Sequence, residues 1–130
     1  MTDYLGLEIV TLLALIEYSI LGAMVGRARG KYYVSAPATT GNADFERYFR
    51  VHQNTLEALI VFLPALWIFS LNVHYRFGVA LGALFLLGRI IYANGYLKAS
   101  EKRGPGAAAT FIINSILVLG GLGGLIFKAL

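Results

Sequence analysis

Hydrophobic positions along the chain form four long blocks that are separated by short polar segments. The blocks cover residues 4–26, 56–73, 77–97 and 106–127. Each is close to the length of about 20 residues with which a helix crosses a hydrocarbon core roughly 30 Å thick. The pattern therefore predicts an all-α integral membrane protein, a four-helix transmembrane bundle in a single domain of residues 1–130.

The second block is preceded by a charged segment without glycine or proline, FERYFRVHQNT, residues 45–55. Asn42 or Asp44 can cap a helix at this point. We therefore expect the second helix to begin near Phe45 and to cover residues 45–73. The segment NVHYR that follows is long enough only for a tight connection, so the second and third helices should form an antiparallel pair.

Basic residues concentrate in two of the connecting segments. They are Arg27, Arg29, Lys31, Arg47 and Arg50 in the first, and Lys98, Lys102 and Arg103 in the second. Only Arg76 and Lys128 lie toward the other side. Because basic loops stay in the cytoplasm, we expect loops 27–52 and 98–105 there and both termini on the opposite side. Short loops of this kind suit a bacterial inner membrane, and an organelle membrane stays open as an alternative.

The amino-acid composition excludes several classes of function. With 58% hydrophobic and 14% charged residues, the chain is too apolar for a soluble domain of 130 residues. Its net charge of +4 follows from the membrane topology and from attraction to lipid, so no nucleic-acid partner is expected. The absence of cysteine excludes disulfides and a protein thiol nucleophile. His52 and His74 stand apart and are expected at the interface, with no metal site.

Polar side chains follow a helical spacing in the second and third blocks. One stripe, with spacing i, i+4 and i+7, consists of Arg50, Asn54 and Glu57. The other, with spacing i, i+3 and i+7, consists of Arg89, Tyr92 and Tyr96. Polar groups in a span normally face the protein interior or a wet cavity. The two stripes are therefore expected to face each other and to form a polar pocket that opens to the cytoplasmic side.

Simpler interpretations of these residues stay open. Arg50 can extend to lipid phosphates, Glu57 and Arg89 can form a buried structural ion pair, and the two tyrosines can belong to an interfacial aromatic belt. Glu17 fits either a helix-packing bond or a proton-coupled site. Three pairs of small residues also predict close helix contacts: Gly22 with Gly26, Gly78 with Gly82, and Gly120 with Gly124.

The motifs FERYFRVHQNTLE and GRIIYANGY resemble the signatures of the second and third helices in one family, the membrane-associated proteins in eicosanoid and glutathione metabolism (MAPEG). The microsomal glutathione transferase branch is the most similar. The loop YVSAPATTG is also similar to the loop that precedes the first signature in part of the family. The resemblance is carried by motifs over residues 29–105 and by the pattern of spans elsewhere.

The resemblance implies a homotrimer that binds glutathione, as cosubstrate, between neighbouring subunits near the cytoplasmic side. The matching positions that would hold the tripeptide are Arg50, Asn54, Glu57, Tyr92 and Tyr96. Arg29 would reach in from the next subunit, joined by Gln53 or His52. Arg103 matches the arginine that stabilises the thiolate, with Lys102 as a rival. Ala58 replaces a tyrosine that follows the glutamate in some members.

The implied activity is that of a membrane-bound glutathione transferase acting on lipophilic electrophiles. Glutathione peroxidase activity toward lipid hydroperoxides is a further option. Two alternatives stay open. A lipid-binding, non-catalytic member of the same family would not ionise glutathione, and a small proton-coupled exporter would depend on Glu17 rather than on the two stripes.

Overall fold

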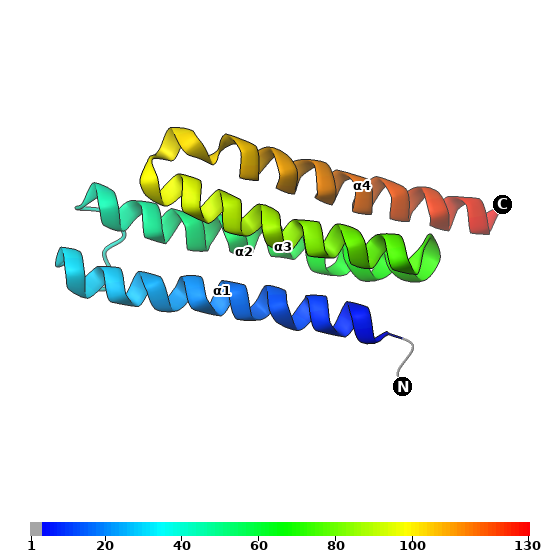
Figure 1. Ribbon diagram of the computed structural model, residues 1–130, viewed down its shortest axis with the longest axis horizontal. Helices are drawn as coiled ribbons and strands as arrows, with labels where there is room; N and C mark the ends of the chain where they lie inside the picture. Colours follow the sequence, from blue (N-terminus) through cyan, green and yellow to red (C-terminus); the bar gives the residue numbers. More distant parts are fainter. Residues whose placement is uncertain (1–3) are drawn as a thin grey trace.

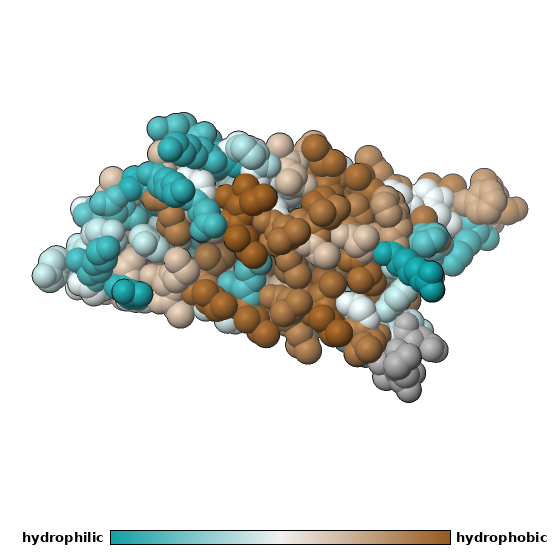
Figure 2. Space-filling model, in the orientation of Figure 1, coloured by the Kyte–Doolittle hydropathy of each residue, from teal (hydrophilic) through white to brown (hydrophobic). Residues whose placement is uncertain are grey.

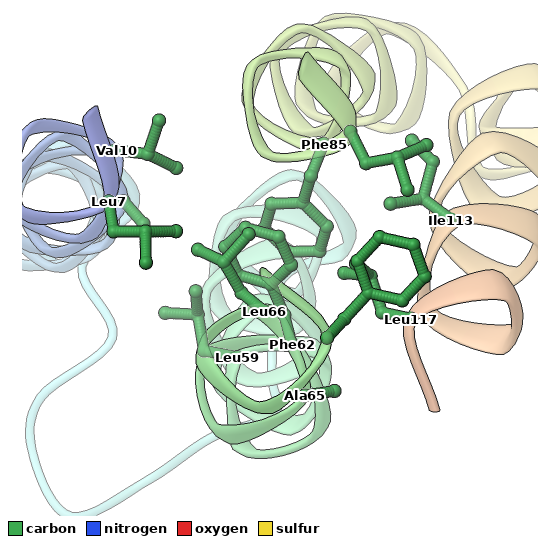
Figure 3. Close-up of a cluster of buried hydrophobic side chains, with 12 residues drawn as sticks. Leu7, Val10, Leu59, Phe62, Ala65, Leu66, Phe85, Ile113 and Leu117 are labelled. Carbon is green, nitrogen blue, oxygen red and sulfur yellow. The ribbon is translucent and has the colours of Figure 1, made fainter. Parts of the chain in front are cut away.

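The structure, a computed structural model, describes residues 4–130 and contains four long α-helices. They are α1 (Leu5–Tyr32), α2 (Ala43–Asn72), α3 (Tyr75–Lys98) and α4 (Gly104–Ala129), with a short 3₁₀ helix η1 (Ser100–Arg103) before α4. The helices lie side by side along their lengths, with α2 and α3 between α1 and α4 (Figures 1 and 3). The predicted all-α, four-helix architecture is confirmed; the first three residues of the predicted domain lie outside the described part.

All four helices are long and apolar enough to cross a membrane, counting η1 with α4. In the space-filling view a hydrophobic band covers the middle of the molecule, and hydrophilic residues gather at its ends (Figure 2). The hydrophilic end with the larger area is the end where the loops α1–α2 and α3–α4 lie (Figures 1 and 2). These features indicate an integral membrane protein whose two basic loops share one side.

Local signals place the helix ends close to where they are predicted. Asn42 caps α2, because its Oδ1 accepts a hydrogen bond from the Phe45 backbone N–H at 3.0 Å. Only Val73 and His74 separate α2 from α3, which confirms the tight antiparallel connection. The first helix differs: α1 continues six residues beyond position 26, to Tyr32. The hydrophobic window locates the apolar part of a helix, whereas the helix itself continues into the polar segment.

The core is built from all four helices around one aromatic pair. Phe62 of α2 and Phe85 of α3 stack with ring centroids 3.7 Å apart, and both are fully buried. Leu7 of α1 packs from one side and Leu117 of α4 from the other (Figure 3). These contacts hold α2 against α3 in the core of the bundle, and they thereby set the register of the polar residues nearer the loops.

Small residues allow the closest helix approaches. A Cβ added at Gly82 would lie 2.7 Å from Val10 of α1, and one added at Gly120 would lie 2.6 Å from Phe69 of α2. Gly26, by contrast, has nothing within 4 Å of such an atom. The expected close contacts therefore exist for the pairs in α3 and α4, while the pair in α1 is open at Gly26.

Candidate functional site

The two polar stripes meet where α2 packs against α3. The Asn54 side-chain Nδ2 donates a hydrogen bond of 2.6 Å to the Tyr92 hydroxyl, which joins the two helices directly. Tyr92 is 3% exposed, so the surrounding helices hold its ring in place. A cavity of about 590 Å³ opens beside this pair between α2, α3 and α4, and its polar lining includes Asn54, Glu57, Arg89 and Tyr92. We call it the α2–α4 cavity.

A second, smaller hollow of about 280 Å³ lies at the loop end of the same two helices. Arg50 and Tyr96 line it, together with Arg47 and Ser100. The rings of Tyr92 and Tyr96 are 5.6 Å apart, so the two tyrosines connect this hollow with the α2–α4 cavity. Polar groups thus continue from the loop end of the bundle into its interior.

Arg89 has partners that the sequence pattern does not reveal. Its Nη2 donates to Thr55 Oγ1 at 2.7 Å and its Nη1 donates to Thr110 Oγ1 at 3.2 Å. The guanidinium carbon also lies 4.0 Å from the centroid of the Tyr92 ring. Within residues 4–130 no ion pair joins Arg89 to Glu57, so the simpler interpretation of these two residues as an ion pair is wrong. The only sequence signal for Thr110 was its hydroxyl inside an apolar block, and Thr55, at the end of the polar segment 45–55, gave no such signal.

Glu57 is exposed at the edge of the α2–α4 cavity, halfway along α2. It makes no hydrogen bond or ion pair with the described part of its own chain. A carboxylate at that depth is costly unless another group compensates it. Glu57 is therefore available to a ligand or to a neighbouring subunit.

The remaining candidates lie around the loop end rather than in the α2–α4 cavity. Arg29 Nη1 donates to the backbone oxygens of Val34, at 3.3 Å, and Ala38, at 2.7 Å, and so holds the loop after α1. Arg103 Nη1 donates to the Ser100 backbone oxygen at 3.1 Å, and its guanidinium carbon lies 5.9 Å from the centroid of the Tyr96 ring. Gln53 is half-buried on α2 and lines neither hollow. One chain thus brings three of the predicted residues together at the α2–α4 cavity: Asn54, Glu57 and Tyr92. Arg50 and Tyr96 lie at the neighbouring hollow.

The two histidines make local contacts. His52 stacks on Tyr18 of α1, with ring centroids 4.4 Å apart. His74 caps α3, since its Nδ1 accepts from the Phe77 backbone N–H at 3.1 Å. Among residues 4–130 no group of three or more histidine, aspartate or glutamate side chains is arranged to hold a metal ion.

Comparison with known proteins gives consistent matches. The sequence model of the MAPEG family matches residues 7–123. An uncharacterized protein of Synechocystis sp. is 50% identical over 121 residues, 93% of this chain and 88% of its own length. Human microsomal glutathione S-transferase 2 is 37% identical over 118 residues, 90% of this chain and 80% of its own. Leukotriene C4 synthase of Rattus norvegicus is 33% identical over 97 residues, 75% of this chain and 65% of its own.

Proposed function

Because the chain belongs to the MAPEG family, we propose that it is a membrane-bound glutathione transferase. In this proposal it binds glutathione at the cytoplasmic end of α2 and α3 and activates the thiolate for attack on lipophilic electrophiles. The matches to a microsomal glutathione S-transferase and a leukotriene C4 synthase support a glutathione-related activity in general. We propose that the protein resides in a bacterial inner membrane, because one of its relatives comes from the cyanobacterium Synechocystis sp..

The hydrogen bond between Asn54 and Tyr92 is the observation that carries the proposal. It brings residues of both signature motifs together at one cavity, beside the Glu57 carboxylate, which is unpaired within residues 4–130. Glutathione has two carboxylates and one ammonium group. Arg50 can bind a carboxylate through charge-assisted hydrogen bonds, and Glu57 can bind the ammonium group. The charges available along the stripe thus match those of the tripeptide in kind.

The chemistry needs a thiolate, and one arginine suffices to produce it. A free thiol has a pKa of about 8.5 and is only a few per cent ionised at neutral pH. Lowering that pKa by about 2 units requires roughly 2.7 kcal/mol. A unit charge about 4 Å away contributes on the order of 4 kcal/mol at an effective dielectric constant of about 20. Arg103 is the proposed source of this charge, with Lys102 as the rival.

Ionisation by itself gives a limited acceleration, since the thiolate fraction can rise only about thirtyfold. The remainder of the rate enhancement must come from holding the thiolate against the electrophile. We propose that the apolar substrate arrives laterally from the bilayer. With a lipid hydroperoxide as substrate, two glutathione molecules would supply the two electrons, giving the alcohol, water and glutathione disulfide.

The complete site in this proposal lies between subunits of a homotrimer. Two features support it: Glu57 is exposed at the edge of the α2–α4 cavity, and Arg29 lies at the loop end and does not line that cavity. Arg29 uses only Nη1 for its two loop hydrogen bonds. Its other guanidinium donors are therefore available to a glutathione carboxylate bound mainly by the neighbouring subunit.

Titration of glutathione into the purified protein tests the proposal, with thiolate ultraviolet absorbance and binding heat recorded together. Wild type should bind glutathione and show thiolate near neutral pH. Arg103→Ala should keep at least part of the binding but lose about 90% or more of the thiolate signal, as expected for removal of a stabilisation of roughly 2.7 kcal/mol. Lys102→Ala is the matched control and should retain the signal.

Three other results would change or contradict the proposal. Loss of the signal in Lys102→Ala but not in Arg103→Ala would exchange the two roles. Binding without any thiolate would favour a non-catalytic lipid-binding protein. The absence of glutathione binding in the wild type would contradict the proposed function.

A further inference from the structure

A different cavity, which we call the α1–α3 cavity, lies between α1 and α3 and has a volume of about 430 Å³. Its walls are mostly apolar, with Ile16 and Ile20 from α1 and Leu86 and Ile90 from α3. Ile16 is 53% exposed and Ile90 is 48% exposed, so the cavity opens on the apolar outer surface of the chain. The volume is within the range of about 300–1,000 Å³ that is usual for ligand pockets.

Three polar side chains line this otherwise apolar cavity: Glu17, Arg89 and Asn94. Glu17 is partly buried and makes no hydrogen bond or ion pair with residues 4–130. Arg89 is 3% exposed, and its Nε has no hydrogen-bond partner in the same part of the chain. A buried donor and a carboxyl acceptor without partners are both unfavourable, and native proteins usually satisfy such groups.

A purely structural role would lead to a different arrangement. If Glu17 served only to neutralise the buried arginine, the two side chains would be expected to form an ion pair. Their opposite charges attract each other, but no direct ion pair joins them in the described chain, although both line the same cavity. The hydrogen bonds of Arg89 go instead to Thr55 and Thr110, and the space beside Glu17 remains open.

We propose that the α1–α3 cavity binds a single-chain lipid whose polar head is an uncharged O–H group. One such group can donate a hydrogen bond to the Glu17 carboxylate and accept one from the Arg89 Nε–H, so it suits the two groups that lack a hydrogen-bond partner within residues 4–130. A carboxylate head would be repelled by Glu17, and an ammonium head by Arg89. The alkyl chain would lie along the apolar walls, which it reaches from the bilayer without crossing water.

The proposed lipid site and the proposed glutathione site are different cavities that share Arg89. The polar lining of the lipid site comes from α1 and α3, whereas Asn54, Glu57 and Tyr92 line the α2–α4 cavity. Binding at the α1–α3 cavity can therefore be measured without glutathione, and a negative result there leaves the proposed transferase activity untouched.

The test uses hexadecanol that carries a photoreactive diazirine near the end of its chain, added to the full-length protein in lipid nanodiscs. Labelled peptides are identified by mass spectrometry. In the wild type, labelling should concentrate on the segments of α1 and α3 that line the cavity. Ile16→Trp should reduce it at least fivefold by filling the cavity. Leu12→Trp is the matched control, since Leu12 is 59% exposed on the same helix and does not line the cavity.

Glu17 variants test the role of the polar head. Glu17→Leu removes the acceptor and should reduce labelling about tenfold or more, as expected for loss of a hydrogen bond to a charged group. Glu17→Gln keeps an acceptor but removes the charge, so it should retain labelling. In the Glu17→Gln variant, unlabelled hexadecanoic acid should compete with the probe, because the repelling charge is gone. In the wild type only unlabelled hexadecanol should compete.

Competition also distinguishes the possible sources of the O–H group. Displacement of the probe by a fatty acid hydroperoxide methyl ester, as well as by hexadecanol, would assign the site to oxidised lipids in addition to alcohols. Equal competition by hexadecylamine, equal labelling along all four helices, or unchanged labelling in Ile16→Trp would each overturn the proposal. Circular dichroism and gel filtration of every variant separate loss of binding from loss of fold.

Discussion

At the scale of single residues, the arrangement around Arg89 determines the position of Tyr92. A buried guanidinium is tolerated only when its donors and its charge are compensated. Thr55, Thr110 and the Tyr92 ring provide part of this compensation from three helices, while Nε has no hydrogen-bond partner within residues 4–130. The Tyr92 ring is therefore held from its face by the guanidinium and at its hydroxyl by Asn54. A rigid tyrosine at this position is suited to orient a ligand in the α2–α4 cavity.

Substitution of Tyr92 by phenylalanine tests this role with little change of volume. The variant leaves the Asn54 amide without its 2.6 Å partner. Since a hydrogen bond contributes about 0.5–1.5 kcal/mol net, the KM for glutathione should rise about three- to tenfold while kcat changes less. Steady-state kinetics with glutathione varied provide the measurement.

The matched control is Tyr33→Phe, because Tyr33 is 93% exposed in the loop after α1. It should behave as wild type. An unchanged KM for glutathione in Tyr92→Phe would show that the Tyr92 hydroxyl does not contribute to glutathione binding. The role of Tyr92 would then be limited to packing.

At the scale of elements, the hairpin formed by α3, η1 and α4 is packed closely enough to fix Arg103 relative to Tyr96. Gly106, in the first turn of α4, lies directly against the backbone of Tyr92. Gly95 of α3 likewise lies against the Lys102 carbonyl group of η1. Both contacts involve main-chain atoms, which cannot move aside as a flexible side chain can. The connection that carries Arg103 is thereby held on the loop end of α3.

The Gly106→Ala variant should show how much depends on this contact. An added methyl group would meet the Tyr92 backbone, and overpacking of this kind typically costs about 1–3 kcal/mol. We expect a lower free energy of unfolding in detergent, together with weaker glutathione binding because Tyr92 is displaced.

Gly123→Ala is the control on the same helix, since an added Cβ has nothing within 4 Å there. It should be neutral, or more stable by up to about 1 kcal/mol through the helix propensity of alanine. Equal stability of the Gly106 and Gly123 variants would show that α3 and α4 can separate without consequence.

At the scale of the whole molecule, the chain forms a buried core, but it does not bring all of the proposed site residues together. Phe62, Phe85 and the side chains around them are buried within the chain. Glu57, by contrast, is exposed within an apolar span, and Arg29 does not line the α2–α4 cavity. In a ring with head-to-tail interfaces, each site combines two different surfaces of neighbouring subunits. The proposed trimer would complete the site in this way.

Mixing of two inactive variants tests whether the site crosses the subunit interface. Arg29→Ala and Arg50→Ala would each disable every site of a homotrimer. In trimers assembled from equal amounts of both, about a quarter of the sites should receive an intact Arg29 from one subunit and an intact Arg50 from its neighbour. Transferase activity of co-expressed, co-purified trimers provides the measurement.

Zero recovery in confirmed mixed trimers would place Arg29 and Arg50 in the same subunit's site, because then no site contains both. Arg27→Ala paired with Arg50→Ala is the control. It should give about half of the wild-type activity, because the Arg27→Ala subunits keep both site residues.

The predicted orientation can be tested because the chain has no cysteine. Thr39→Cys places one thiol in the exposed loop between α1 and α2, and Leu130→Cys places one at the opposite end. By the positive-inside rule, a membrane-impermeant maleimide added to intact spheroplasts should label Leu130→Cys and not Thr39→Cys. After permeabilisation both should be labelled, and the reverse pattern in intact cells would invert the topology.

The sequence by itself determined the four helices, their antiparallel order and the two polar stripes. These features depend on local properties: the length of an apolar run, a capping side chain such as Asn42, a two-residue connection, and the helical period that aligns Asn54 with Glu57. The family resemblance also came from residues close in sequence. The roles of Arg29, Gln53 and Arg103 toward glutathione stay predictions.

Only the tertiary structure decided which groups face each other across helices. It paired Arg89 with Thr55 and Thr110 rather than with Glu57, and it left Glu17 beside an open cavity. The axial register and rotation of one helix against another depend on the packing of side chains from several helices, as at Phe62 and Phe85. Helical periodicity within one segment defines a face, but the partner of that face depends on contacts between residues far apart in the chain.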